Sequence, residues 1–200
     1  EGYTNLLGQG LSFVDFNLDG WDDLTVPNAS GEIDFHAGGP DGFTEVNLGI
    51  SASWGRPMAV MWLDIDNDGD RDFLHASSMT VSVFGCPTDS SRSQVWINED
   101  GVFVDRTSEW GWDILQNRPC MGLSFYDVDA DGDLDGMVSN YAMPCSEMWL
   151  TENVLLQNEG NTFLDVSEPS GIANGLAPTF QSAWMNLDGD SLIDLFVIND

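Results

Sequence analysis

Short apolar and aromatic runs alternate with clusters of Asp, Asn and Gly along the whole chain, a pattern that predicts short β-strands joined by tight turns. The pattern recurs. In each copy a first run ends just after an aromatic residue, an acidic loop follows, and a second run rich in Val, Leu or Phe leaves the loop. The aromatic residues are Phe13, Trp62, Phe125 and Trp184, and the second runs cover 24–26, 73–75, 137–138 and 195–197. The sequence therefore predicts a series of β-hairpins, each with an acidic loop at its tip.

Two more runs follow each of the first three hairpins and predict a third and a fourth strand. The third strands are expected at 35–37, 95–97 and 154–156, and turns rich in Gly, Asn and Asp separate them from fourth strands containing Phe43, Phe103 and Phe163. The acidic loops start at residues 15, 64, 127 and 186, so their spacings are 49, 63 and 59 residues. Such spacings suit a four-stranded propeller blade and are too long for a single hairpin.

We therefore predict an all-β fold, a β-propeller of four-stranded antiparallel blades, with about three and a half blades in residues 1–200. The expected blades cover approximately 1–48, 49–108 and 109–169, and a half blade covers 170–200. A half-made blade leaves unpaired strand edges. We interpret the chain as a segment of a longer propeller, and closure by two chains is the alternative.

The acidic loops carry side-chain oxygens at positions 1, 3, 5 and 9, and the first three loops have Gly at position 6. Gathering this many carboxylates costs free energy unless a cation neutralises them. The expected ligands are these four side chains and the backbone carbonyl of position 7. By loop, they are Asp15, Asn17, Asp19, Trp21 and Asp23; Asp64, Asp66, Asp68, Asp70 and Asp72; Asp127, Asp129, Asp131, Asp133 and Asp135; and Asn186, Asp188, Asp190, Leu192 and Asp194.

Hard oxygen ligands in this number suit Ca²⁺, so we predict up to four calcium ions, each stapling one hairpin. An EF-hand would need flanking helices and an acid at position 12, but the predicted flanks are strands. Position 12 is occupied by Val26, His75, Val138 and Val197. The fourth loop is expected to bind most weakly, because Asn186 stands at position 1, Ser191 at position 6, and Gly189 two residues before Ser191.

The composition limits the classes of partner that the chain can bind. The chain has 34 acidic residues against five basic ones, all arginine, and a formal net charge of −29, which repels nucleic acid and anionic membranes. Four calcium ions would cancel eight charges and leave −29 + 8 = −21. No apolar run approaches about 18 residues, so no membrane span is predicted. Cys86, Cys120 and Cys145 fit no zinc motif, and their odd count leaves at least one without a partner in the chain.

The repeat as a whole reads aromatic-x-D-x-D-x-D-G-x-x-D-L, then N-x-G-x-x-F-x-D-V and G-I. It resembles the FG-GAP/VCBS repeats of integrin-α-like β-propellers over nearly the whole chain. The resemblance implies a seven- or eight-bladed propeller that is secreted or lies at the cell surface, with Ca²⁺ in each hairpin loop. Asn186 and Ser191 depart from the family pattern in the fourth loop.

Two functions remain open at this stage. The first is a non-enzymatic extracellular module for adhesion, protein or glycan interaction, or surface assembly. The long connections 77–93 and 140–152, expected opposite the calcium loops, would contact the partner, although they can also be idle insertions. The alternative is the propeller frame of a polysaccharide-active enzyme such as a lyase, with its active site outside this segment. Acids that recur in every unit argue against a catalytic pair, and we expect His36 and His75 to be ordinary strand residues.

Overall fold

The computed structural model describes residues 9–28, 30–52, 55–79, 90–141, 152–173 and 178–200, and within them the fold is almost entirely antiparallel β-sheet. The first sheet contains β1 (Ser12–Val14), β2 (Asp23–Pro27), β3 (Ile33–Ala37) and β4 (Thr44–Val46). The second contains β5 (Arg56–Leu63), β6 (Asp72–Ser78), β7 (Gln94–Glu99) and β8 (Val102–Asp105). The third contains β9 (Cys120–Tyr126), β10 (Asp135–Asn140), β11 (Val154–Asn158) and β12 (Phe163–Asp165).

A final hairpin pairs β13 (Thr179–Met185) with β14 (Asp194–Asn199). Consecutive strands are neighbours in every sheet, so each sheet is a simple meander. The prediction of an all-β fold built from antiparallel four-stranded sheets is confirmed by the first three sheets. Each sheet and the final hairpin falls within one of the predicted units.

Register in the hairpins places the aromatic residue two positions before each loop directly opposite the first residue after the loop. Trp62 faces Phe73 across β5 and β6, and Phe125 faces Gly136 across β9 and β10. A Cβ at Gly136 would lie 3.0 Å from the Phe125 ring, so the absence of a side chain leaves room for that ring. The aromatic residue thus has the same cross-strand position in each hairpin, but the residue opposite it ranges from Phe73 to Gly136.

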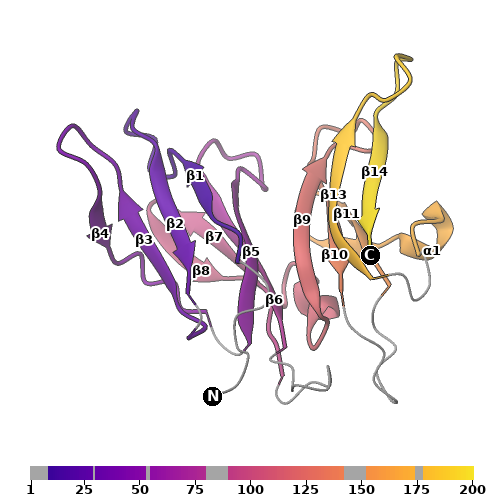
Figure 1. Cartoon of the computed structure of the whole chain (residues 1–200). Coiled ribbons are helices and arrows are strands. Elements are labelled where there is room, and N and C mark those ends of the chain that lie inside the picture. Colours follow the sequence, from indigo (N-terminus) through magenta and orange to yellow (C-terminus); the bar gives the residue numbers. More distant parts are fainter. Residues whose placement is uncertain (1–8, 29, 53–54, 80–89, 142–151, 174–177) are drawn as a thin grey trace.

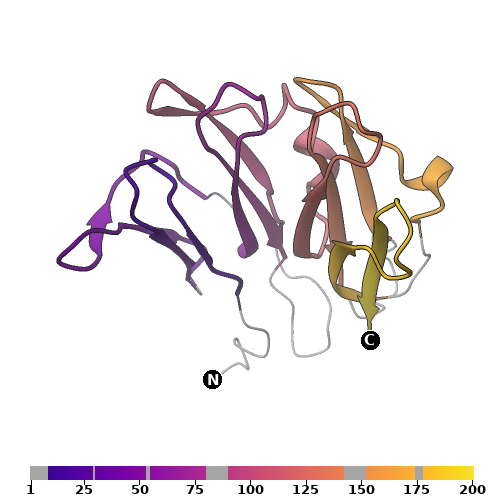
Figure 2. The same cartoon turned by 90° about the horizontal axis from the view of Figure 1, so that it is seen from above.

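The sheets stand beside one another in chain order, and the first strands of neighbouring sheets are in contact (Figures 1 and 2). A cluster containing Phe16, Phe35, Trp62 and Phe73 fills the space between the first and second sheets. Within it Phe16 stacks on Trp62 at 4.6 Å between ring centroids, and the Trp62 indole donates a hydrogen bond of 2.9 Å to Thr25. Burial of these large aromatic side chains holds the two sheets together.

A short 3₁₀ turn, η1 (Trp112–Leu115), helps to fill the space between the second and third sheets. Trp112 and Leu115 are fully buried, and the Trp112 ring lies 5.1 Å from that of Phe163. A second short helix, α1 (Ser167–Ser170), follows the third sheet and ends at Gly171, whose φ is 76°.

Candidate metal centres

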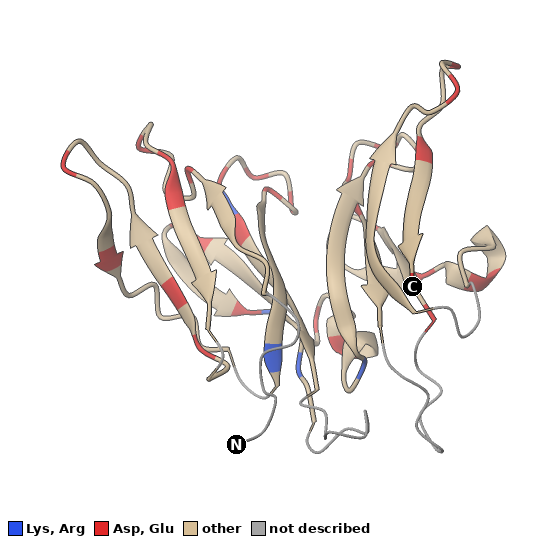
Figure 3. Ribbon diagram, viewed as in Figure 1, with Lys and Arg blue, Asp and Glu red and all other residues tan. Residues whose placement is uncertain are grey.

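The four acidic loops lie at the hairpin tips, between β1 and β2, β5 and β6, β9 and β10, and β13 and β14. Figure 3 shows acidic residues at these tips, which lie at one end of the sheets. Strands flank every loop, and this excludes the helix–loop–helix arrangement of an EF-hand.

Side chains at positions 1, 3 and 5 turn inward and accept hydrogen bonds from amides of their own loop. In the third loop Asp127 Oδ2 accepts from Gly132 N at 3.1 Å and Asp129 Oδ1 from Asp131 N at 3.2 Å. Asp131 Oδ1 in turn accepts from Asp133 N at 2.9 Å. The first and second loops repeat these contacts. The loop backbone therefore directs these oxygens toward its own interior.

Position 9 has a different role from the others, because its carboxylate ties the loop to the sheet. Asp135 is 1% exposed and accepts from Val128 N at 2.7 Å and from Asn158 N at 2.9 Å. An oxygen bonded to one amide keeps a second lone pair for a cation. The same paired contacts link Asp72 to Ile65 and Asn98, and Asp23 to Phe16 and Gly38.

Two loops bring three carboxylates close enough to share one ion. One oxygen from each of Asp64, Asp66 and Asp72 lies within 4.8 Å of the others, and Asp127, Asp129 and Asp135 form a second such triad. Oxygens bound to one Ca²⁺ at about 2.3–2.6 Å can be up to about 5 Å apart, so both triads are of suitable size.

The second loop also contains carboxylate oxygens that nothing satisfies. Asp64 Oδ1 and Asp70 Oδ1 are buried atoms without a hydrogen-bond partner. Buried polar atoms are normally paired, and an unpaired oxygen within a ring of carboxylates is the donor that a hard cation would use. These residues therefore fit a hard divalent cation.

Burial, together with neighbouring carboxylates, raises the pKa values of several aspartates in the loops. Burial, partly opposed by two amide hydrogen bonds, raises the pKa of Asp72 to about 7. Burial and the neighbouring charge of Asp68 raise the pKa of Asp70 to about 6. Burial likewise raises the pKa of Asp66 and Asp135. A bound divalent cation would favour the ionised forms and so reverse these shifts.

The fourth loop has a different backbone. Position 4 adopts a positive φ in the first three loops although it is not glycine there: 59° for Leu18, 60° for Asn67 and 63° for Ala130. Gly189 takes this position in the fourth loop with φ 82°, and Ser191 at position 6 does not adopt the positive φ seen at Gly132. The Asn186 amide is engaged by its own loop, because Oδ1 accepts from Gly189 N at 2.6 Å. The backbone of the fourth loop therefore departs from the conformation that the first three loops share, and its weaker binding stays a prediction.

Side chains of the second loop reach both neighbouring loops. Asn67 Nδ2 donates to Asp133 Oδ1 of the third loop at 2.7 Å, and Arg71 Nε donates to the Asp15 carbonyl of the first loop at 3.1 Å. The three tips are thus connected to one another as well as to their own sheets.

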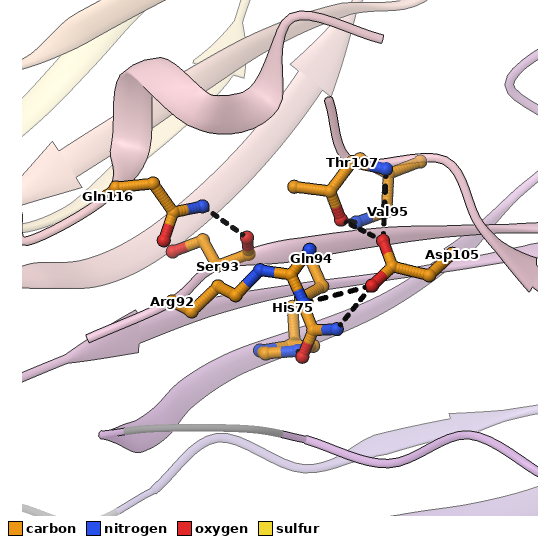
Figure 4. Close-up of polar contacts among 8 residues, drawn as sticks. All are labelled: His75, Arg92, Ser93, Gln94, Val95, Asp105, Thr107 and Gln116. Atoms are coloured by element: carbon orange, nitrogen blue, oxygen red, sulfur yellow. Dashed lines mark hydrogen bonds and ion pairs between the residues drawn. The ribbon is translucent and has the colours of Figure 1, made fainter. Parts of the chain in front are cut away.

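A second polar group, inside the second sheet, was not anticipated from the sequence (Figure 4). His75 is completely buried; its Nδ1 lies 3.1 Å from Ser77 Oγ and its Nε2 lies 3.1 Å from Gln94 Oε1. Gln94 donates to Asp105, which also pairs with Arg92 at 2.9 Å. Burial raises the pKa of Asp105, but hydrogen bonds and the Arg92 charge outweigh it and hold the pKa below its usual value.

Burial lowers the pKa of His75 to about 4, so its charged form disfavours the folded state. Between about pH 6.5 and pH 4 the unfolded chain, with a His pKa of about 6.5, binds a proton that the folded chain does not bind. The free energy of unfolding therefore decreases as the pH falls through this range. We expect His75→Gln to reduce the loss of unfolding free energy between pH 7 and pH 5 by about 2 kcal/mol. Urea titrations of the unmodified chain and of the variant at both pH values would measure it. An equal loss in the two proteins would contradict the prediction.

Some predictions concern residues outside the described part of the chain. The partner connections 77–93 and 140–152 lie mostly there, as do Cys86 and Cys145. The flanking strands β6 and β10 end at Ser78 and Asn140, and β7 and β11 begin at Gln94 and Val154; all four of these strand ends lie opposite the hairpin tips. Cys120 is a buried free thiol, and burial raises its pKa to about 12.

No protein-family model matches this sequence, and no curated protein matches it. Among the described residues, no helix is long and apolar enough to cross a membrane.

Proposed function

We propose that this chain is a calcium-binding β-propeller module in which each ion staples the first hairpin of a blade. The observation that carries the proposal is the pair of carboxylate triads, which occupy the same three loop positions in two successive sheets. Propeller packing is supported by the contacts between first strands of neighbouring sheets, as expected for blades arranged about a common axis.

The module would act as a rigid scaffold outside the cell or at its surface, in adhesion or assembly, with a protein or glycan bound at the end opposite the hairpin tips. Extracellular modules bind Ca²⁺ with dissociation constants of about 10⁻⁴–10⁻³ M, which suits a setting rich in calcium. The proposal assigns the carboxylates no catalytic role, because the same positions recur in each sheet and bond to their own loop amides.

Calorimetric titration with Ca²⁺ tests the metal sites. The double variant Asp66→Asn, Asp129→Asn is expected to weaken binding at two sites by about tenfold or more, since each site loses one formal charge. Asn17 shows that asparagine is tolerated at this position, because its Oδ1 accepts from Asp19 N at 2.9 Å as the aspartates do. The variants therefore change charge and leave the loop conformation intact.

Asp113→Asn is the matched control, because this exposed aspartate in η1 carries the same charge away from the hairpin tips. It should titrate like the unmodified chain. Failure of the unmodified chain to bind millimolar Ca²⁺, or an unchanged isotherm for the double variant, would refute the assignment.

A further inference from the structure

Two aspartates at the same loop position have different surroundings. Position 7 is Asp70 in the second loop and Asp133 in the third. Asp133 Oδ1 accepts the hydrogen bond of 2.7 Å from Asn67 Nδ2, so its carboxylate is held by the neighbouring tip. Asp70 Oδ1 is buried and has no hydrogen-bond partner. The second loop therefore contains an acidic oxygen that the protein itself does not satisfy.

The residue at position 4 of the preceding loop accounts for this difference. In the second loop this residue is Asn67, whose amide makes the contact with the third loop. In the first loop it is Leu18, whose side chain has no donor to offer Asp70. The first and second tips are nevertheless in contact, because Arg71 Nε donates to the Asp15 carbonyl. Asp70 is thus left without a partner although its loop has a neighbour on that side.

A second oxygen of the same loop is also unsatisfied. In the third loop Asp127 Oδ1 accepts from Asp131 N at 3.1 Å. In the first loop Asp15 Oδ1 accepts from Asp19 N at 3.1 Å. The equivalent atom of the second loop, Asp64 Oδ1, is buried without a partner. Burial of an unpaired carboxylate oxygen costs free energy, so such an oxygen gains more from a bound ion than one that already accepts from an amide.

The position of Asp70 suits a contact with the ion through water. The carboxylates close enough to share an ion are those of Asp64, Asp66 and Asp72, and Asp70 is not part of this triad. Burial contributes most to the raised pKa of Asp70 and the charges of Asp68 and Asp66 come next, so its carboxylate lies near the other acids of the loop. Ca²⁺ takes about six to eight oxygens, and the four side chains and one carbonyl expected from a loop leave room for water.

We propose that the Asp70 carboxylate accepts a hydrogen bond from a water molecule bound to the ion of the second loop. This outer contact, together with the unpaired Asp64 Oδ1, makes the second loop bind calcium more tightly than the third. Substitution of a group that hydrogen-bonds to the ligands of a metal typically changes the affinity by about 10–100-fold. The inference rests on the proposed function, because it needs a calcium ion in the loop, and it adds an order of affinity that the repeated motif does not contain.

Calorimetric titration of single variants with Ca²⁺ tests the proposal. The unmodified chain should show one tight phase before the weaker sites fill. Asp66→Asn should weaken that phase and Asp129→Asn should leave it unchanged, which assigns it to the second loop. Asp70→Asn should weaken the tight phase by about tenfold or more and leave the other phases unchanged. The substitution keeps the backbone carbonyl of position 7, so the change reports the side chain alone.

Asp133→Asn is the matched control, because it removes the same charge at the same loop position from an oxygen that Asn67 holds. It should leave the tight phase unchanged. Asn67→Ala should strengthen the third site, since it frees Asp133 for the role that Asp70 has in the second. Alanine is tolerated at position 4, because Ala130 adopts φ 63° there and Asn67 adopts φ 60°. An unchanged or weaker third site would overturn the role given to Asn67.

Three other results would overturn the inference. They are an isotherm of Asp70→Asn equal to that of the unmodified chain, an equal loss of the tight phase in Asp133→Asn, and loss of that phase in Asp129→Asn with its retention in Asp66→Asn. Each of these leaves the proposed function intact, because calcium still binds. A chain that binds no millimolar Ca²⁺ refutes the metal sites and this inference together.

Discussion

Chelation of calcium is expected to lower the melting temperature by about 10 °C at millimolar metal, the largest effect that the loops predict. Calcium at 1 mM with a dissociation constant of about 10⁻⁴ M contributes about 1.4 kcal/mol for each site that binds only the folded chain, or about 4 kcal/mol for the three regular loops. In a domain of this length, about 1 kcal/mol shifts the midpoint by about 2–4 °C. Without the ion, burial and the neighbouring carboxylates raise the pKa of Asp70 to about 6, so the ionised loop is less stable.

Differential scanning calorimetry with and without EDTA measures this shift. Sodium chloride at matched ionic strength is the control, because it screens charge without coordinating. Magnesium should restore less stability than calcium, since it prefers to keep several of its waters. A melting temperature that does not respond to EDTA, or that sodium chloride restores in full, would contradict stapling by a bound ion.

Substitution of a buried position-9 aspartate should have the second largest effect, and measurement without metal isolates its hydrogen bonds from any role in holding an ion. We expect Asp135→Ala to lower the unfolding free energy by about 3 kcal/mol. The substitution removes two hydrogen bonds to a carboxylate, from the amides of Val128 and Asn158, and leaves the Asn158 amide without its acceptor in a buried site.

Asp194→Ala in the final hairpin is the matched control. Asp194 holds one amide, that of Leu187 at 2.8 Å, in an exposed loop, so a loss of only about 1 kcal/mol is expected. Urea unfolding in EDTA near pH 8 removes the metal contribution from both variants. Equal losses would show that the second hydrogen bond and the burial of Asp135 add nothing.

The repeated part of this fold could be predicted from sequence because its causes are local. Alternation of apolar and polar residues defined the strands, and the acidic loops between aromatic and β-branched runs defined the hairpins. The tight turn after β7 shows the same dependence on local residue type: Asp100 and Gly101 adopt φ of 54° and 88°, as a two-residue hairpin loop requires. Strand limits shifted by up to three residues, as in β6, which was expected to end at residue 75 and continues to Ser78.

Features that depend on contacts between sheets could not be predicted. Motif spacing predicted Asp135 as a metal ligand, but it gave no sign of the hydrogen bond from the Asn158 amide, which comes close only when β11 packs beside β10. The buried 3₁₀ turn η1, which contains Trp112, is too short to show a helical period in the sequence. Burial of His75 depends on the neighbouring sheet and on Gln94, and one strand sequence does not reveal either.

The side chains that join neighbouring hairpin tips bear on how the protein would empty of metal. The second tip holds the third through Asn67 and the first through Arg71, so disorder at the second tip releases two anchors at once. Loss of ions should therefore be cooperative, because the second tip and its two neighbours lose these contacts together. The loss of bound calcium would then occur over a narrower range of free calcium concentration than it would at independent sites.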